Sequence, residues 1–102
     1  MNLIWHPDTQ DEIDEGVDYY FEKQLGVEEE FIAELEAAVR KLLKDPSFPR
    51  EFDPPYRKVV TDRFPYQIVY RISGDSAWIV AVMHQSRRPD YWKKREATWK
   101  AE

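Results

Sequence analysis

The chain has 102 residues, a formal net charge of −5 and no cysteine. This length fits one domain, which we place over residues 1–102, and the lack of cysteine excludes disulfides, thiolate metal sites and a cysteine nucleophile. No apolar run approaches the roughly 20 residues needed to span a bilayer, and the first residues lack the pattern of a signal peptide, so we expect a soluble intracellular protein without a membrane partner.

Charge is distributed unevenly along the chain. Residues 1–45 carry 13 acidic and 4 basic side chains, a net charge of −9, whereas residues 46–102 carry 7 and 11, a net charge of +4. The overall acidity argues against generic nucleic-acid binding. The basic second half leaves a local anionic partner open, and the alternative is solvated surface charge without any partner.

The first half of the chain predicts two helices. Residues 3–5 form a candidate first strand, and His6-Pro7-Asp8 then favours a helix start because proline is tolerated in the first turn. Apolar residues at helical spacing follow, with Gly26 as the expected C-cap. Glu28 to Glu30 open a second helix that Pro46 ends. Its apolar stripe consists of Phe31, Leu35, Ala38, Val39, Leu42 and Leu43. The short turn between the helices predicts an antiparallel helical hairpin.

The second half predicts strands. After a proline-rich connection over residues 46–55, Tyr56–Val60 is a candidate strand. Residues 63–72 and 76–84 are rich in β-branched and aromatic residues and flank Ser73-Gly74-Asp75, which predicts a β-hairpin. The later strand is apolar on both faces, as central strands are. Strict alternation would place Ala77, Ile79, Ala81 and Met83 on one face and Trp78, Val80 and Val82 on the other.

The segment after this strand, residues 84–92, is polar, basic and aromatic. Pro89 is expected to reopen a helix at its first position, with Trp92, Glu96 and Trp99 at helical spacing. The predicted fold class is therefore α+β: an N-terminal helical hairpin packed on a small antiparallel β-sheet, with a C-terminal helix.

One residue is a candidate for catalysis. His84 ends the predicted central strand beside Arg87, and imidazole titrates near neutral pH. It could act as a general acid or base on a phosphodiester that arginine holds, or it could simply bond backbone at a strand end. The sequence contains no glycine-rich phosphate loop, zinc spacing or nucleophile elbow, and only two histidines, so we expect no metal site and no cofactor.

Other side chains are candidates for binding. Arg87 and Arg88 precede a predicted helix start, which suits an anion, although pairing with Asp90 and solvent is an alternative. Tyr91 and Trp92 could stack on a base, but neighbours on a helix point in different directions, and we assign Trp92 to the core. The candidate binding residues are Arg57, Arg63, Arg71, Trp78, Arg87, Arg88 and Tyr91.

These residues carry a family resemblance. From Arg63-Phe64-Pro65-Tyr66 through Ile68-Val69-Tyr70 to Val82-Met83-His84 and Arg87-Arg88-Pro89-Asp90-Tyr91-Trp92, the chain resembles the RelE/ParE superfamily, toxins of type II toxin–antitoxin systems and plasmid stabilisation. The His6-Pro7 start, the second helix and Tyr56-Arg57 agree with it. The resemblance implies a two-helix hairpin on an antiparallel sheet, and a bacterial, cytoplasmic toxin neutralised by an antitoxin encoded beside it.

The family that the chain resembles has two branches with different toxic mechanisms. The RelE-like branch cleaves mRNA in the ribosome and has an arginine just before the Leu-Val-Tyr of its middle strand. Here that position is Gln67, whose neutral amide cannot supply the positive charge needed in phosphoryl displacement. His84 matches the terminal histidine of some ribonuclease members but precedes Gln85 instead of tyrosine, and the acidic net charge fits poorly with ribosomal RNA. The ParE-like branch inhibits DNA gyrase, and its typical ending, His-x-x-Arg-x-Pro-x-Tyr-Trp, looks like His84–Trp92.

We therefore favour a ParE-like toxin that inhibits DNA gyrase. The alternatives are a ribosome-dependent mRNA endonuclease, in which His84 and Arg87 would be catalytic, and a non-toxic member that only binds its partner, so whether the chain is an enzyme stays open, as does its oligomeric state. The partner expected from charge is an acidic, partly disordered antitoxin tail. It would lie on the sheet face bearing Val69, Arg71 and Trp78, opposite the hairpin, where an amphipathic helix could lay its apolar face, and an extended segment could pair with a free sheet edge.

Overall fold

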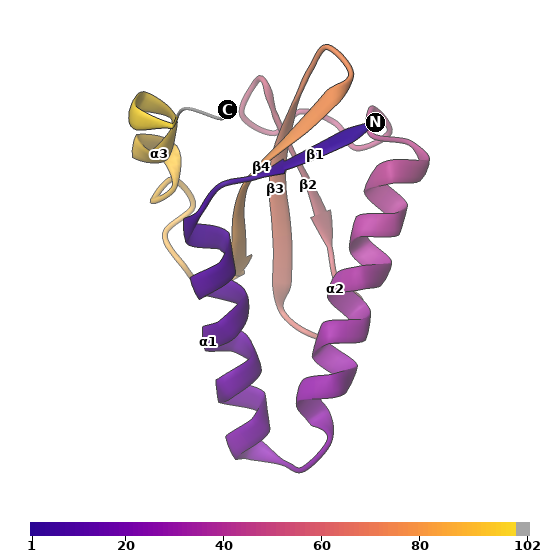
Figure 1. Cartoon of the computed structure of the whole chain (residues 1–102), viewed down its shortest axis with the longest axis vertical. Coiled ribbons are helices and arrows are strands. Elements are labelled where there is room, and N and C mark those ends of the chain that lie inside the picture. Colours follow the sequence, from indigo (N-terminus) through magenta and orange to yellow (C-terminus); the bar gives the residue numbers. More distant parts are fainter. Residues whose placement is uncertain (100–102) are drawn as a thin grey trace.

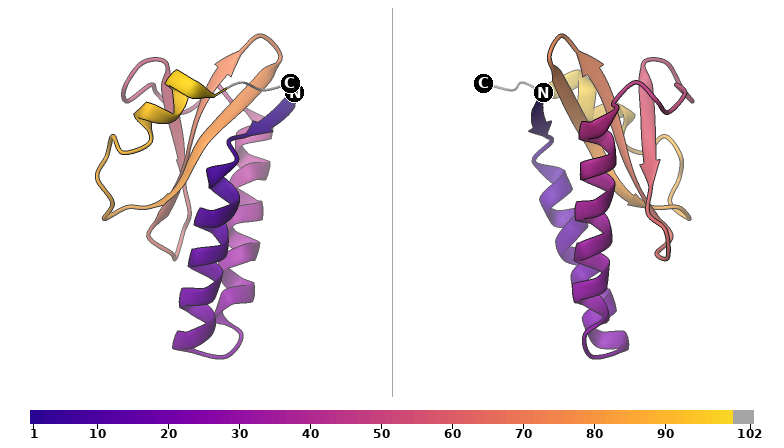
Figure 2. Two further views of the ribbon diagram at one scale, coloured as in Figure 1. Left: turned by 60° about the vertical axis from the view of Figure 1, so that its left-hand side comes forward. Right: turned by 90° about the vertical axis from the view of Figure 1, so that its right-hand side faces the viewer.

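Helices α1 and α2 lie on one face of a four-stranded sheet in the computed structural model, which describes residues 1–99 (Figure 1). The elements are β1 (Asn2–Trp5), α1 (Asp8–Lys23), α2 (Val27–Lys44), β2 (Tyr56–Val60), β3 (Tyr66–Ser73), β4 (Ser76–His84) and α3 (Lys93–Thr98). Figure 2 shows α3 on the other side of the sheet from the two long helices. The predicted α+β class, with a helical hairpin on a sheet, is confirmed.

The turn between the helices differs from the prediction in one detail. Helix α1 ends at Lys23 because Gln24 is already extended (φ −164°, ψ 135°). Gly26 is therefore not the C-cap of α1; it is the residue that precedes α2, with φ 89° in the left-handed region that glycine adopts without a Cβ clash. Pro46 follows α2 closely, as expected for a residue that cannot continue a helix.

The sheet has the strand order β1-β4-β3-β2. Strands β2, β3 and β4 are antiparallel neighbours, whereas β1 runs parallel to β4, with Leu3 opposite Ala77. The sheet is thus mixed, because the chain leaves β1 through the whole helical hairpin before it returns, a crossover long enough to bring a parallel strand alongside. The prediction that the strand over residues 76–84 is central is confirmed.

A β-bulge changes which faces the residues of β4 occupy. Val69 pairs with Ala81 and Tyr70 with Ile79, so Val80 is an extra residue in β4. Ile79 and Val82 consequently both lie in the core under the helices, while Val80, Ala81 and Met83 lie on the opposite face. Strict alternation was the wrong prediction for Ala81, Val82 and Met83, since one inserted residue reverses every later side chain.

The sheet separates two cores. Under the helices, the fully buried residues include Phe31, Leu42, Ile68, Tyr70 and Ile79. On the opposite face, Trp92 is fully buried over Val69, Val80, Ala81 and Met83, and Tyr56, Tyr91 and Trp99 surround it. The assignment of Trp92 to the core is confirmed, and the second core explains why β4 is apolar on both faces.

The C-terminal helix begins later than predicted. Residues 89–92 form turns, in which Tyr91 N donates to Arg88 O and Lys93 N donates to Asp90 O, and α3 starts at Lys93. A helix from Pro89 would direct the adjacent rings of Tyr91 and Trp92 about 100° apart around its axis. The turns instead allow Trp92 to enter the second core while Tyr91 reaches α1.

Helices α1 and α2 approach each other closely at Gly16. A Cβ atom at this position would lie 2.7 Å from the ring of Phe31, which is fully buried. We expect Gly16→Ala to lower the free energy of unfolding by about 1–3 kcal/mol through overpacking, despite the roughly 1 kcal/mol by which alanine favours a helix. Urea unfolding measures this, with the exposed Asp18→Ala of the same helix as control. An unchanged midpoint for Gly16→Ala would contradict the close approach.

Candidate functional site

A groove of about 390 Å³ lies at the end of the sheet where β4 stops, on the face opposite the long helices. It is lined by Lys58, Val60, Gln67, Met83, Gln85, Arg87 and Pro89, and we name it the basic groove. Strands β2, β3 and β4 supply its floor, and the loop after β4 supplies its wall. The structure thus brings Arg87 beside Gln67, the position that distinguishes the two mechanisms.

His84 is bonded to its own loop. Its Nδ1 accepts the backbone N–H of Ser86 at 3.0 Å and the hydroxyl of Ser86 at 2.7 Å, which places the ring proton on Nε2. The ring packs edge-on against Tyr66, with centroids 5.4 Å apart. This arrangement is that of a histidine bonded to backbone at a strand end, the second of the two interpretations of His84.

The other predicted arginines occupy separate places. Arg87 stacks on Tyr91, with its guanidinium carbon 4.0 Å from the ring centroid, and Arg88 is exposed. Arg57 donates to the backbone carbonyls of Ser47 and Pro49. Arg63 lies beside α2, where it pairs with Glu30 and Glu34 at 3.1 and 3.0 Å. Only Arg87 among these residues lines the basic groove.

Arg71 and Trp78 hold the C-terminal helix. The guanidinium of Arg71 donates to both carboxylate oxygens of Glu96, at 2.7 and 3.2 Å, and lies 4.6 Å from the ring of Trp78. Trp78 in turn packs edge-on against Trp99. The predicted antitoxin face is therefore largely occupied by the chain itself, and Arg71 binds an internal carboxylate.

Sequence reasoning missed the most connected polar group, the carboxylate of Glu12. It is buried, and it accepts hydrogen bonds from the Val82 amide at 2.9 Å, from the Tyr91 hydroxyl, and from two nitrogens of Arg95 at 3.0 Å each. Arg95 also donates to the Val80 carbonyl at 2.8 Å. These bonds cap the edge of β4 beyond the short strand β1 and fix the C-terminal segment to α1. Nothing in the acidic pattern of α1 distinguishes Glu12 from its exposed neighbours.

Burial of the tyrosines around this segment predicts alkaline instability. Burial and the carboxylate of Glu96 raise the pKa of Tyr56 to about 12, and burial with Glu12 raises the pKa of Tyr91. Unfolded tyrosine ionises near pH 10, so the stabilisation is complete below about pH 10 and is lost as the pH rises toward 12. We expect the free energy of unfolding to fall over this interval, less steeply in Tyr56→Phe. Chemical unfolding at several pH values tests this, and equal slopes in Tyr56→Phe and the exposed Tyr19→Phe would contradict it.

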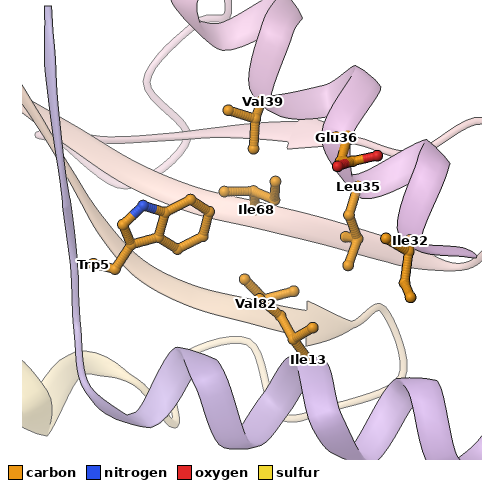
Figure 3. A pocket seen from close by; sticks show the side chains of 8 residues that line it. All are labelled: Trp5, Ile13, Ile32, Leu35, Glu36, Val39, Ile68 and Val82. Atoms are coloured by element: carbon orange, nitrogen blue, oxygen red, sulfur yellow. The ribbon is translucent and has the colours of Figure 1, made fainter.

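A second groove opens between the two long helices. It has a volume of about 320 Å³, and we name it the helix groove. Its lining is Trp5, Ile13, Ile32, Leu35, Glu36, Val39, Ile68 and Val82. Figure 3 shows Ile68 and Val82 of the sheet between the side chains of the two helices, with Trp5 at one end. Trp5 and Ile32 are each 39% exposed, so this apolar surface is accessible. The helical patterns predicted both apolar stripes but not the angle at which the helices diverge (Figure 1).

Within residues 1–99, no group of three or more histidine, cysteine, aspartate or glutamate residues is placed to hold a metal ion. None of the helices in this range has the length and apolar character needed to cross a membrane.

Comparison with known proteins identifies the family. A family model described as "ParE toxin of type II toxin-antitoxin system, parDE" matches residues 3–89. A solved chain described as "Chromosomal ParDE TA system from P. aeruginosa" has the same fold, with a TM-score of 0.69 and 18% sequence identity over 82% of this chain and 95% of that chain. No curated protein matches. The match over most of the sequence, on a hairpin-and-sheet fold, shows that this chain belongs to the ParE family of type II toxin–antitoxin toxins.

Proposed function

We propose that this ParE-family toxin inhibits DNA gyrase in the cytoplasm and is neutralised by an antitoxin encoded beside it. The observation that supports gyrase inhibition over RNA cleavage is the composition of the basic groove. Its polar lining consists of two cations, Lys58 and Arg87, and two amides, Gln67 and Gln85. These groups can bind an anionic or polar surface.

Cleavage of a phosphodiester requires catalytic groups in addition to a binding surface. It needs a group that removes a proton near neutral pH and cations placed on the charge that develops in the transition state. Nδ1 of His84 is already an acceptor for Ser86, and Gln67 is uncharged. The arrangement supports a toxin that works by binding a protein target, which is the ParE-like mechanism.

The helix groove is the site we propose for the helical part of the antitoxin. Seven of its eight lining side chains are apolar, and an amphipathic helix that lays its apolar face into such a groove is a common mode of recognition. This placement replaces the sheet face favoured by the sequence, where Arg71 and Trp78 already hold the chain's own α3.

The deciding experiment compares the two activities of one purified preparation. We expect the chain to inhibit DNA supercoiling by gyrase, with inhibition relieved by the antitoxin, and to leave ribosome-bound mRNA intact. In cells, growth arrest should come with filamentation and a DNA-damage response. Ribosome-dependent cleavage that disappears in His84→Ala would overturn the proposal in favour of the endonuclease. Normal growth under strong induction of folded protein would indicate a non-toxic member.

A further inference from the structure

Strand β2 forms an outer edge of the sheet. Thr61 N donates to Tyr66 O at 3.0 Å, and because antiparallel pairing alternates, Arg57 and Val59 also direct their amides and carbonyls toward β3. Tyr56 faces outward, where its amide and carbonyl bond Asp53 and Phe52. Lys58 and Val60 face outward as well. Within residues 1–99 no other strand covers them, so two amides and two carbonyls are open to a new strand.

The surface beside this edge is apolar and cationic. A hollow of about 620 Å³ lies between β2 and the end of α2, and we name it the edge hollow. It is lined by Lys41, Lys44, Asp45, Phe48, Pro49, Lys58, Val59 and Val60. Phe48 is 82% exposed and Val60 is 42% exposed.

The basic groove adjoins the edge hollow. Lys58 and Val60 line both, so the two depressions meet at the free edge of β2. Together they contain four cations, Lys41, Lys44, Lys58 and Arg87, against the single carboxylate of Asp45. The edge is therefore flanked on both faces of the sheet by positive charge beside apolar side chains.

We propose that the β2 edge binds an extended segment of the antitoxin, which adds to the sheet as a further strand. The inference rests on the proposed function for the identity of the partner, and on the edge for its chemistry. Open backbone groups bind a strand through main-chain hydrogen bonds, and side-chain pockets select its sequence. The segment that fits alternates acidic residues, which meet Lys58 and Arg87 on the face of the basic groove, with apolar residues, which cover Phe48 on the face of the edge hollow.

Two other occupants fit the edge less well. A second copy of the chain would bring its own lysines against these, since Lys58 lies in the middle of the edge, and like charges on paired strands oppose pairing. Nucleic acid would use the cations but would leave the backbone amides and carbonyls of Lys58 and Val60 without partners, and the chain carries a net charge of −5.

Amide hydrogen exchange followed by NMR tests the proposal at single residues. In the complex with the antitoxin encoded beside the toxin, we expect the amides of Lys58 and Val60 to exchange at least tenfold more slowly than in the toxin alone. The amides of Arg57 and Val59, already bonded to β3, should change less. This alternation is a signature of an added strand, because a helix or a loop lying over the edge would not distinguish odd from even positions.

The outcomes separate the two proposals. A complex without slower exchange at Lys58 and Val60 overturns the edge site alone, while failure to form any complex overturns the proposed partner and the edge site with it. Slower exchange that grows with toxin concentration in the absence of antitoxin would assign the edge to a second copy. Slower exchange caused by duplex DNA would assign it to nucleic acid, and either result overturns the proposal.

Substitutions provide a second measurement. Val60→Pro removes an outward amide, which an edge strand tolerates, and its neighbour Val59 already has the extended backbone that precedes proline. We expect a tenfold or greater rise in the Kd for the antitoxin with the thermal midpoint retained. Lys58→Glu should also raise the Kd, whereas the matched control Lys23→Glu, at the far end of α1, should not. An equal effect of both charge reversals would overturn the placement.

Discussion

Replacing Glu12 with alanine is expected to lower the free energy of unfolding by about 3–5 kcal/mol, the usual cost of removing one partner from a buried ion pair. The side chain accepts bonds from Val82, Tyr91 and Arg95. Its loss would leave the Val82 amide and the Tyr91 hydroxyl without their acceptor, and would leave the Arg95 guanidinium with only the Val80 carbonyl and Asp8. A small domain has only about 5–15 kcal/mol of stability, so this one substitution removes a large part of it.

Denaturant unfolding of Glu12→Ala and the exposed Glu15→Ala measures the effect on the same helix. Glu12→Gln is the variant to use if Glu12→Ala does not fold. The glutamine side chain keeps one oxygen that can accept from the Val82 amide, but its NH2 group is a donor and would face the donor nitrogens of Arg95. We therefore expect a loss of stability smaller than that of Glu12→Ala. If Glu12→Ala and Glu15→Ala lost similar amounts, the carboxylate would not be the polar anchor of the C-terminal segment.

Truncating Trp92 to alanine should cost about 3–5 kcal/mol as well, because a fully buried ring leaves a cavity over Val69 and Met83. Trp92→Phe is the informative comparison. Within residues 1–99 the indole Nε1 has no hydrogen-bond acceptor, and an unpaired buried donor costs about 1–3 kcal/mol. Phenylalanine removes that donor and keeps most of the packing against Tyr56.

We therefore expect Trp92→Phe to lose clearly less than half of what Trp92→Ala loses, measured by unfolding in denaturant with both variants under the same conditions. Equal losses would mean that the indole nitrogen contributes to stability, and would contradict its unpaired state.

The elements of the fold were predictable because their signals are local. Alternation in residues 66–72, helical spacing in α2 and the apolar character of both faces of β4 each follow from burial within a single segment. The bulge at Val80 was not predictable, because a single extra residue has no signature in composition. The parallel pairing of β1 depends on where the helical hairpin returns the chain, which is a tertiary property.

The candidate site was only partly predictable, for a similar reason. The sequence directed attention to the loop after β4, and Arg87 of that loop lines the basic groove. It could not tell that Arg71 bonds Glu96 or that Arg63 bonds α2, because ion pairs between distant segments depend on the finished fold. The helix groove arises from the angle between two helices, a quantity that neither helix encodes alone.

The long-range contacts of the N-terminal segment also bear on how the toxin is made. Strand β1 and helix α1 leave the ribosome before β4 and Arg95 do, but β1 pairs with β4, and the bonds from Arg95 to Glu12 join residues 83 positions apart. Contacts of such sequence separation form late, after loop-closure entropy has been overcome. The native fold therefore closes only after Arg95 has been synthesised, so a toxic surface that depends on the closed fold is absent while the earlier elements emerge.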